Sequence, residues 1–354
     1  MSFIVCAAAS GDGSAMAVHK PQDEALHGEE AIIALLAPLT RGHAGAFGLK
    51  DDCALLTPEP GPELVLKTDP VAEGVHFLPG DTPQDIAWKA LAVNVSDLAA
   101  KGAVPLGYLM ALSFPASPTV GWMTGFVEGL GAAQTRFGCH LLGGDTDRRP
   151  GPLTISITII GSVPRGKMVP RITAQTGDAL FVSGTIGDAG LGLELVKSAG
   201  LQAAWGLSDA AGETLRQRYR RPEPRLALAA ALRQYASAAM DVSDGLVKDL
   251  ERMMRASGVA GHLVAADVPL SDPARAVLAR APERLSQLIT AGDDYEILIA
   301  VPEDRASSFA TAAAAAGVPV TRIGRVFAGP PALAVEGPDG RPLDLPERTG
   351  WDHF

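Results

Sequence analysis

Apolar runs of two different periods alternate along the first half of the chain. Strand-like runs lie at 63–69, 106–114 and 153–160, and longer segments with helical spacing lie between them at 82–102 and 119–138. A pattern with the helical period does not fit a strand, and an alternating pattern does not fit a helix. The order therefore predicts an α/β fold (α+β, with mixed sheets) in which helices and strands form one unit.

The first long helix carries its own start signal and a polar stripe. Thr82 is the expected N-cap and Pro83 the first helical residue. Asn94, Asp97 and Lys101 share one side of this otherwise apolar helix. Two interpretations are open, because such a stripe can face solvent or can line a cleft.

A second unit follows a segment rich in Gly and Pro. That segment, 161–173, predicts a linker, and 178–184 then reads as the first strand of another α/β unit. The predicted organisation is a flexible extension at 1–27, an N-terminal domain at 28–160, the linker at 161–173 and a C-terminal domain at 174–354.

Part of the linker partly matches the sequence motif of a phosphate-binding P-loop. GSVPRGKM (161–168) matches every position of G-x-x-x-x-G-K-[ST] except the last, where Met168 has no hydroxyl to hold Mg²⁺. Pro170 also biases Val169 away from the helix that a P-loop requires. We therefore interpret the stretch as a turn between domains, and any nucleotide must be bound by other means.

Charge and cysteine content restrict the class of protein. The formal net charge of −10 and the absence of a Lys/Arg cluster argue against a nucleic-acid partner. Cys6, Cys53 and Cys139 are too scattered for a disulfide framework or a zinc site, which favours a reducing compartment. The first residues lack the basic region of a signal peptide, and no apolar run reaches the ~18 residues of a membrane span. We expect a cytoplasmic protein with no membrane partner.

Aspartates recur where apolar segments end. Any one of them could be a turn former or a helix cap. Together they predict carboxylates that converge at one side of a sheet, where they would repel one another unless cations lay among them. Oxygen ligands without His or Cys favour Mg²⁺, and several Mg²⁺ ions would suit transfer of a phosphoryl group from ATP. These residues are Asp52, Asp69, Asp97, Asp145, Asp241 and Asp244.

Seven ordered motifs resemble the thiamine-monophosphate kinase family, which belongs to the superfamily of aminoimidazole ribonucleotide synthetase and selenophosphate synthetase. Together they extend over almost the whole chain, from about Glu29 to Phe354. The motifs are KDDCALL (50–56), KTDPVAEGVHF (67–77), KALAVNVSDLAAKGAVP (89–105), LLGGDT (141–146), MDVSDGLVKDL (240–250), AGDDYEIL (291–298) and the terminal GWDHF.

The resemblance implies a fold and an activity. It implies two α/β domains with ATP and several Mg²⁺ ions between them, and a homodimer in which the N-terminal sheet pairs across the two chains. The activity implied is transfer of the γ-phosphoryl group of ATP to thiamine monophosphate, the last step of thiamine diphosphate biosynthesis. Transfer would be direct and in line, with no covalent intermediate and hence no catalytic nucleophile.

The resemblance also implies roles for particular residues, transferred motif by motif. The implied metal ligands are Asp52, Thr68, Asp69, Asp97, Asp145, Asp241 and Asp244. The implied ATP contacts are Gly144, Asp145, Arg171 and Ser243, and the implied contacts to thiamine monophosphate are His76, Asp293 and Trp351.

The chain departs from the family pattern at several positions. Lys50 replaces a Gly, Lys67 replaces a Ser, and Asp293 replaces a Glu that is one methylene longer. Near the C-terminus either Arg348 or Trp351 occupies the place of an aromatic residue. Two alternative functions are a sister synthetase of the same superfamily and an inactive nucleotide-binding regulatory protein, in which a lysine ammonium would replace a metal cation.

Overall fold

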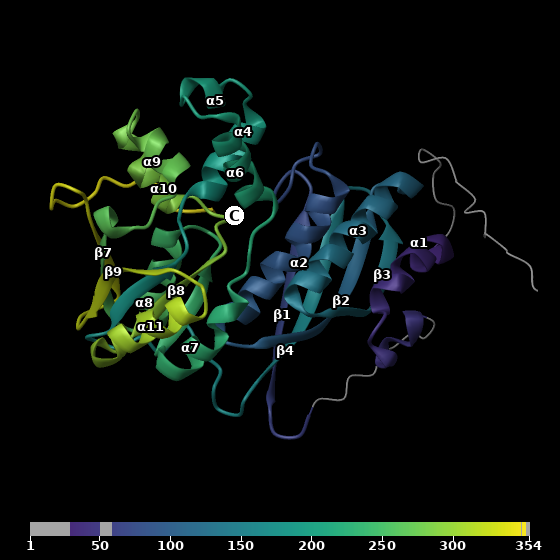
Figure 1. Cartoon of the computed structure of the whole chain (residues 1–354), viewed down its shortest axis with the longest axis horizontal. Coiled ribbons are helices and arrows are strands. Elements are labelled where there is room, and N and C mark those ends of the chain that lie inside the picture. Colours follow the sequence, from purple (N-terminus) through teal and green to yellow (C-terminus); the bar gives the residue numbers. More distant parts are fainter. Residues whose placement is uncertain (1–28, 50–58, 348, 352–354) are drawn as a thin grey trace, which may run out of the picture.

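Two mixed β-sheets organise the residues that the computed structural model describes, which are 29–49, 59–347 and 349–351. The sheets lie in separate halves of the molecule, with the N-terminal half on the right of Figure 1 and the C-terminal half on the left. The prediction of mixed sheets combined with helices is confirmed.

The N-terminal sheet has four strands. Their order is β1 (Glu63–Ala72), β4 (Thr154–Val163), β2 (Val104–Phe114) and β3 (His140–Arg148). β4 is antiparallel to both of its neighbours, whereas β2 and β3 are parallel. One face packs against α2 (Pro83–Ala100) and α3 (Val120–Phe137), and α1 (Glu29–Leu36) with the short turns η1 (Ala37–Thr40) and η2 (Ala44–Leu49) lies beside β3 (Figure 1).

Alternation along β4 shows why only one face is covered by helices. Ile155, Ile157 and Ile159 are fully buried in the core under α2 and α3. The residues between them, Ser156 and Thr158 among others, point to the other face and are half-buried. A strand with period-two polarity buries its apolar side and leaves the polar side outside.

The C-terminal sheet has six strands and more helices. The strand order is β10 (Ala332–Glu336), β7 (Ala260–Val264), β9 (Val320–Phe327), β5 (Ala179–Ser183), β8 (Glu296–Val301) and β6 (Ala238–Val242). The α-helices are α4 (Asp188–Lys197), α5 (Leu201–Ala204), α6 (Asp209–Arg220), α7 (Ala229–Tyr235), α8 (Leu246–Ser257), α9 (Asp272–Leu278), α10 (Leu285–Thr290) and α11 (Ala306–Ala315). Short 3₁₀ turns are η3 (Leu226–Leu228), η4 (Ala265–Asp267), η5 (Pro282–Arg284) and η6 (Glu303–Arg305).

Helices cover both faces at the centre of this sheet. Along β5, Leu180 and Val182 pack into the core that contains α8, whereas Phe181 packs on the other side with α7 and α11. Every residue of β5 and of β8 is buried. Strands buried on both faces read as continuous apolar runs, which is how 178–184 and 295–301 stand out in the sequence.

Helix α2 lies between the two halves and belongs to both cores. Thr82 is its N-cap, since the Thr82 hydroxyl accepts a hydrogen bond from the backbone N–H of Asp85. Leu91 and Leu98 pack under the N-terminal sheet, while Ala99, in the last turn, packs with the C-terminal helices. Fifteen residues of α2 are buried. A helix buried on all sides has no solvent face.

The end of α6 and the residues that follow it contact the start of α2, which joins the C-terminal half to this helix. The Arg220 guanidinium lies 3.0 Å from the Asp81 carboxylate, and the Trp88 indole N–H donates to the Pro222 carbonyl at 2.9 Å. These contacts join residues that are more than 130 positions apart in the sequence. They fix where α2 lies against the C-terminal half.

The near-P-loop segment is a turn, as predicted. β4 continues to Val163, and the turn after it is closed by the Lys167 N–H, which donates to the Pro164 carbonyl at 3.0 Å. The Gly166 N–H donates to the Glu63 carboxylate rather than lying open for a phosphate. No helix follows in this described stretch, where the next element is β5.

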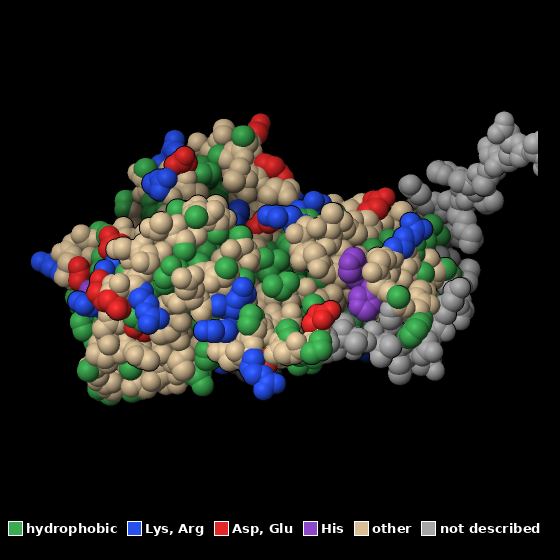
Figure 2. All heavy atoms as spheres, turned by 60° about the horizontal axis from the view of Figure 1, so that its bottom comes forward, with side chains coloured by type: hydrophobic (Ala, Val, Ile, Leu, Met, Phe, Trp, Pro, Cys, Tyr) green, Lys and Arg blue, Asp and Glu red, His purple; other side chains and the backbone are tan. Residues whose placement is uncertain are grey.

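Charge is spread unevenly over the surface. Figure 2 shows a face where Lys and Arg side chains (blue) gather near the middle, although the chain as a whole carries a net charge of −10. Among the described residues, no helix is both long enough and apolar enough to cross a membrane.

Candidate active site

An ammonium lies between two of the predicted metal ligands. Lys67 and Asp69 are two positions apart on β1 and share the side that faces α2. Asp97 reaches the same point from α2. The Lys67 Nζ lies 3.0 Å from Asp69 Oδ2 and 3.0 Å from Asp97 Oδ2. We call these three residues the phosphate end of the candidate site.

The polar stripe of α2 faces the interior. The Asn94 side-chain oxygen accepts a hydrogen bond from the Asp69 N–H at 3.0 Å, and its amide donates to the Ala90 carbonyl at 3.0 Å. Further along α2, the Lys101 Nζ donates to the Ala239 carbonyl of β6 at 2.7 Å. Of the two interpretations left open by the sequence, the solvent-facing stripe is therefore wrong, because the stripe packs against β1 and β6.

Burial controls protonation around this stripe. Burial lowers the pKa of Lys101 to about 8, although Asp241 and Asp97 oppose the change. Burial, together with the nearby charge of Asp97, raises the pKa of Asp241 well above its usual range. For Lys67, burial alone would lower the pKa, but Asp97 and then Asp69 outweigh it and the pKa is raised. The ammonium of Lys67 is therefore stable between its two carboxylates.

Two predicted ligands lie on the opposite face of the N-terminal sheet. Thr68 follows Lys67 on β1 and so points away from α2, where its hydroxyl donates to the Ile157 carbonyl at 3.1 Å. Asp145, on β3, is paired with Ala111 and is exposed on that same outer face. Within one chain the structure therefore separates the side chains of Thr68 and Asp145 from that of Asp69.

Gly144 has a structural reason to be glycine. A Cβ atom at this position would lie 1.8 Å from the Met110 carbonyl oxygen on the neighbouring strand. No side chain fits there. Close approach of β2 and β3 requires the glycine independently of any role in binding nucleotide.

The loop between β6 and α8 is held by a buried aspartate that sequence analysis missed. The Asp249 carboxylate accepts hydrogen bonds from the N–H groups of Ser243 at 3.0 Å and Asp244 at 2.9 Å. Burial raises the pKa of Asp249 to about 6. The Asp244 carboxylate is itself paired with the guanidinium of Arg252. Asp241 lies just before this loop, fully buried at the end of β6.

The AGDDYE loop and the C-terminal tail meet this same loop. The Asp293 N–H donates to the Ser243 carbonyl at 2.8 Å, and the Trp351 N–H donates to the Asp244 carbonyl at 3.0 Å. The Trp351 side chain is 50% exposed. Four of the predicted residues are thus brought together here from three distant parts of the sequence.

Lys89 of α2 reaches the AGDDYE loop from the N-terminal half. Its buried Nζ lies 2.8 Å from Asp293 Oδ2 and 3.8 Å from the centre of the Tyr219 ring. The Tyr219 hydroxyl lies 3.5 Å from the His76 carbonyl oxygen, and the His76 Nδ1 accepts from the Ala72 N–H at 3.0 Å. Asp293, Lys89, Tyr219 and His76 form what we call the acceptor end.

Lys89 and Tyr219 were not predicted. A weak signal for Lys89 is present, because it is a charged residue in the middle of a largely apolar helix. Lys89 lies five positions before Asn94, so it is on a different side of the helix, and the stripe of Asn94, Asp97 and Lys101 does not point to it. Tyr219 carries no comparable signal, since it lies in α6, a helix with mixed polar composition.

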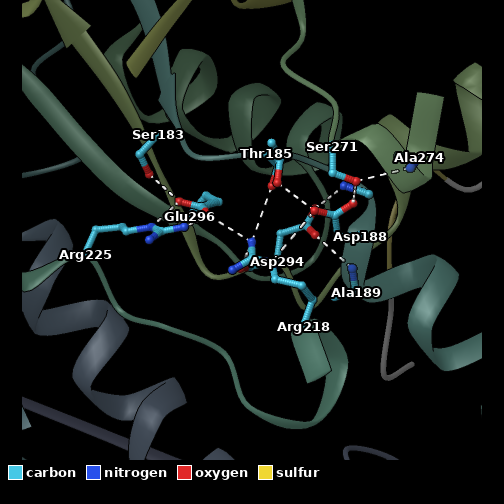
Figure 3. A network of polar contacts seen from close by, with 11 residues as sticks. Ser183, Thr185, Asp188, Ala189, Arg218, Arg225, Ser271, Ala274, Asp294 and Glu296 are labelled. Atoms are coloured by element: carbon cyan, nitrogen blue, oxygen red, sulfur yellow. Dashed lines mark hydrogen bonds and ion pairs between the residues drawn. The ribbon is translucent and has the colours of Figure 1, made fainter. Parts of the chain in front are cut away.

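A buried network binds residues of the chain that follow Asp293, and Figure 3 shows its contacts. The Glu296 carboxylate accepts from Arg225 Nε at 2.7 Å, from Arg218 Nη2 at 2.8 Å and from the Ser183 hydroxyl at 2.6 Å. Asp294 accepts from the backbone N–H groups that open α4, at Gly187 and Ala189 (Figure 3).

The backbone of the AGDDYE loop is strained. Asp293 and Tyr295 have φ angles of 71° and 50°, a region that non-glycine residues seldom adopt. Asp294, which lies between them, and Glu296, which follows, are both fully buried. The network therefore holds a conformation that the loop would not adopt alone.

The remaining predicted residues lie apart from these groups or outside the description. Arg171 is exposed, and its charge contributes to the lowered pKa of Lys101, so it lies near the C-terminal end of α2. Asp52 and Lys50 lie outside the described residues.

Family models match both halves of the chain. The N-terminal domain of AIR synthase related proteins matches residues 50–163, and the corresponding C-terminal domain matches residues 175–335. The thiamine-monophosphate kinase of Caulobacter vibrioides is 44% identical over 91% of this chain and 89% of its own length. The chain belongs to the thiamine-monophosphate kinase family.

Solved structures of thiamine-monophosphate kinases agree with this assignment. The enzyme from Stenotrophomonas maltophilia superposes with a TM-score of 0.76 at 38% identity, covering 87% of this chain and 95% of its own. A structure described as AaThiL complexed with AMPPCP and TMP superposes with a TM-score of 0.72 at 32% identity, covering 92% and 97%. The family resemblance and the two-domain fold predicted from the motifs are confirmed.

For a thiamine-monophosphate kinase, the expected Mg²⁺ requires carboxylates that accept a cation. Within residues 29–49, 59–347 and 349–351, no group of three or more His, Cys, Asp and Glu side chains is placed to hold a metal ion. Asp69 and Asp97 nevertheless hold one cation between them, the ammonium of Lys67. Oxygen donors that converge on a cation in this way fit Mg²⁺ chemically.

Proposed function

We propose that this chain transfers the γ-phosphoryl group of ATP directly to thiamine monophosphate, yielding thiamine diphosphate and ADP. The observation that carries the proposal, beyond family membership, is the position of α2. One helix presents Asp97 to the phosphate end and Lys89 to Asp293 at the acceptor end. Donor and acceptor bound at these two ends would be positioned by a single rigid element, which is the main requirement of phosphoryl transfer.

At the phosphate end, carboxylates would hold Mg²⁺, which neutralises phosphate charge when it is bound. Asn94 keeps the backbone of Asp69 in place, and Asp249 keeps the loop of Ser243 and Asp244 in place. The full proposed ligand set is Asp52, Asp69, Asp97, Asp241 and Asp244, together with Thr68 and Asp145, whose side chains lie on the opposite face of the sheet within one chain. The proposed contacts to ATP are Gly144, Asp145, Arg171 and Ser243.

At the acceptor end, Asp293, His76 and Trp351 would contact thiamine monophosphate. Lys89 fixes the Asp293 carboxylate from one side, and the Tyr295 hydroxyl donates to it at 3.3 Å. Both oxygens of Asp293 therefore have partners that set its orientation. The Trp351 side chain, which is 50% exposed, would contact the aromatic part of the substrate.

The function is tested by measuring ADP release from ATP and Mg²⁺ with thiamine monophosphate, with free thiamine, or with no acceptor. We expect ADP only with thiamine monophosphate, in equal amount to thiamine diphosphate identified by mass. ADP without a matching product would indicate a different acceptor, and no turnover with any of the three would contradict the proposal.

We also propose that the outer face of the N-terminal sheet forms a homodimer. Four large apolar residues are exposed there, namely Leu64 (40%), Leu66 (65%), Val104 (53%) and Leu109 (39%). A contiguous apolar face on an open sheet is typical of a protein–protein contact. Thr68 and Asp145 lie on this same face, so a dimer would bring copies of them from two chains to one surface. The proposed domains, 28–160 and 174–354 with the linker between them, place this face in the N-terminal domain.

The double substitution Leu66→Lys with Leu109→Lys tests the dimer. Two charges on the apolar face should prevent association, because each would be buried without a partner. Light scattering after size-exclusion chromatography should report a dimer for the unchanged chain and a monomer for the variant. Lys substitution of the exposed Phe327, on the C-terminal sheet, is the control and should leave the mass unchanged. A monomeric unchanged chain would contradict the proposal.

A further inference from the structure

Position 67 places a fixed positive charge where the proposed function requires a cation. The Lys67 side chain is 33% exposed, so a ligand can reach it, yet its Nζ lies 3.0 Å from a carboxylate of β1 and 3.0 Å from a carboxylate of α2. Those carboxylates, Asp69 and Asp97, come from elements that are packed together. The ammonium therefore bridges two elements as a bound cation would.

The backbone around this bridge is held on both sides. Lys67 and Asp69 are paired with Ile159 and Ile157 of β4, which are fully buried. The Asp69 N–H is bound by Asn94 of α2, one turn before Asp97. Because both strand and helix are fixed, the backbones that carry the two carboxylates stay side by side.

A divalent ion and the ammonium cannot share that point. Mg²⁺ binds carboxylate oxygens at about 2.0–2.1 Å, and a lysine ammonium 3.0 Å from both oxygens fills the same space. Their like charges would also repel strongly at such a separation. One of the two must be excluded unless Lys67 moves away.

We propose that Lys67 is a built-in cation of the phosphate end, which replaces one divalent ion that Asp69 and Asp97 would otherwise bind. This inference rests on the proposed function for the role of the phosphate end. A lysine can contact phosphate oxygens as a point charge. Unlike a metal ion it is always present, so part of the positive charge at this site is independent of the free Mg²⁺ concentration.

Counting bound Mn²⁺ in the full-length protein tests the proposal without requiring turnover. Free Mn²⁺ is followed by its electron paramagnetic resonance signal while the metal is titrated into the unchanged chain and four variants. Lys67→Ser and Lys67→Met remove the charge, Lys67→Arg keeps it, and Lys197→Ser removes an exposed lysine at the end of α4 as a control for net charge.

We expect the Lys67→Ser chain to bind one more Mn²⁺ than the unchanged chain, or to bind its tightest Mn²⁺ at least tenfold more strongly. Lys67→Met should give a smaller change in the same direction, while Lys67→Arg and Lys197→Ser should match the unchanged chain within twofold. Equal numbers and affinities in the unchanged, Ser and Met chains would overturn the proposal, because Lys67 would then move aside for the metal.

A kinetic measurement separates this proposal from the proposed function. In the ADP-release assay, the rate of Lys67→Ser should depend more steeply on the free Mg²⁺ concentration than that of the unchanged chain, because one more ion must bind, and the rate of Lys197→Ser should follow the unchanged chain. If the unchanged chain makes no thiamine diphosphate, the proposed function fails, whereas the Mn²⁺ titration still decides the role of Lys67.

Discussion

The two ends of the candidate site hold their charges in different ways. At the phosphate end, Lys67, Asp69 and Asp97 have side chains that are 33%, 40% and 23% exposed. Behind the acceptor end, Glu296 is fully buried and is shared by Arg218 and Arg225. The first group can exchange partners with ligands from solvent, whereas the second cannot.

This difference in solvent exposure indicates which charged groups can bind ligands and which hold the surrounding chain in position. Ion pairs that water reaches contribute little to stability and can be reorganised at low cost. A buried carboxylate with two guanidinium partners is costly to disrupt, because each partner left behind would be an unpaired buried charge. Substitutions at the phosphate end should therefore affect mainly turnover, and substitutions in the network of Figure 3 should affect mainly stability.

The largest effect is expected from Glu296→Gln. Loss of this charge leaves Arg225 without its carboxylate partner and Arg218 with only Asp188, 3.8 Å away, so the free energy of unfolding measured with urea should fall by about 3–5 kcal/mol. Glu303→Gln is the matched control, since Glu303 also pairs with two arginines but is 44% exposed. It should cost about 0–1 kcal/mol. Similar losses in both variants would remove the distinction between buried and solvent-exposed ion pairs.

Asp69→Asn should instead reduce turnover and leave the stability of the fold almost unchanged. Turnover of ATP with thiamine monophosphate should fall by about 10²–10³-fold, because charge stabilisation at the transferring phosphate is weakened. The circular dichroism spectrum and the melting temperature should remain close to those of the unchanged chain. Asp272→Asn, on a side chain that is 93% exposed, is the control and should keep full activity. A rate within threefold of normal for Asp69→Asn would exclude Asp69 from the phosphate end.

The last expected effect is a pH dependence of stability in the network. Burial raises the pKa of Asp294 to about 8. Between about pH 4 and 8, the folded chain therefore keeps a proton that the unfolded chain has released, and stability due to this group falls as pH rises. Asp294→Asn removes this dependence, so its stability relative to the unchanged chain should improve from pH 5 to pH 8, by at most ~1.4 kcal/mol per pH unit.

Urea unfolding of both chains at pH 5, 6.5 and 8 measures this difference. Asp304→Asn, an exposed carboxylate in η6, is the control and should differ from the unchanged chain by less than ~0.5 kcal/mol throughout. A stability difference between Asp294→Asn and the unchanged chain that is the same at all three pH values would show that Asp294 is charged in the folded chain.

Signals contained within short segments of the sequence, such as helix caps and hydrophobic periods, predicted many of the helices and strands. Thr82 and Pro83 mark the start of α2 because capping depends only on residues within one turn. The strands β1, β2, β4, β5 and β8 follow from periods that belong to single segments. β6 was missed, because its short apolar run, 238–242, adjoins the apolar pattern of α7 and has no period of its own.

The arrangement of the site depends on contacts that no single segment contains. Asp145 follows an apolar run just as Asp69 does, yet strand register places the two on opposite faces of the sheet. Lys67 was recognised as a departure from the family, but its position between two carboxylates requires the packing of β1 against α2. Lys89 acquires a role only through Asp293, which lies 204 positions away.

The burial of α2 between the two sheets has a consequence during synthesis. The chain leaves the ribosome from its N-terminus, so α2 is complete long before its partners in the C-terminal half exist. Lys101 must wait for Ala239, 138 residues later, which at 5–20 residues per second takes about 7–28 s. Throughout that interval Lys89, Ala99 and Lys101 lack their partners in the C-terminal half, and they mark the surface that a chaperone would cover on a nascent chain.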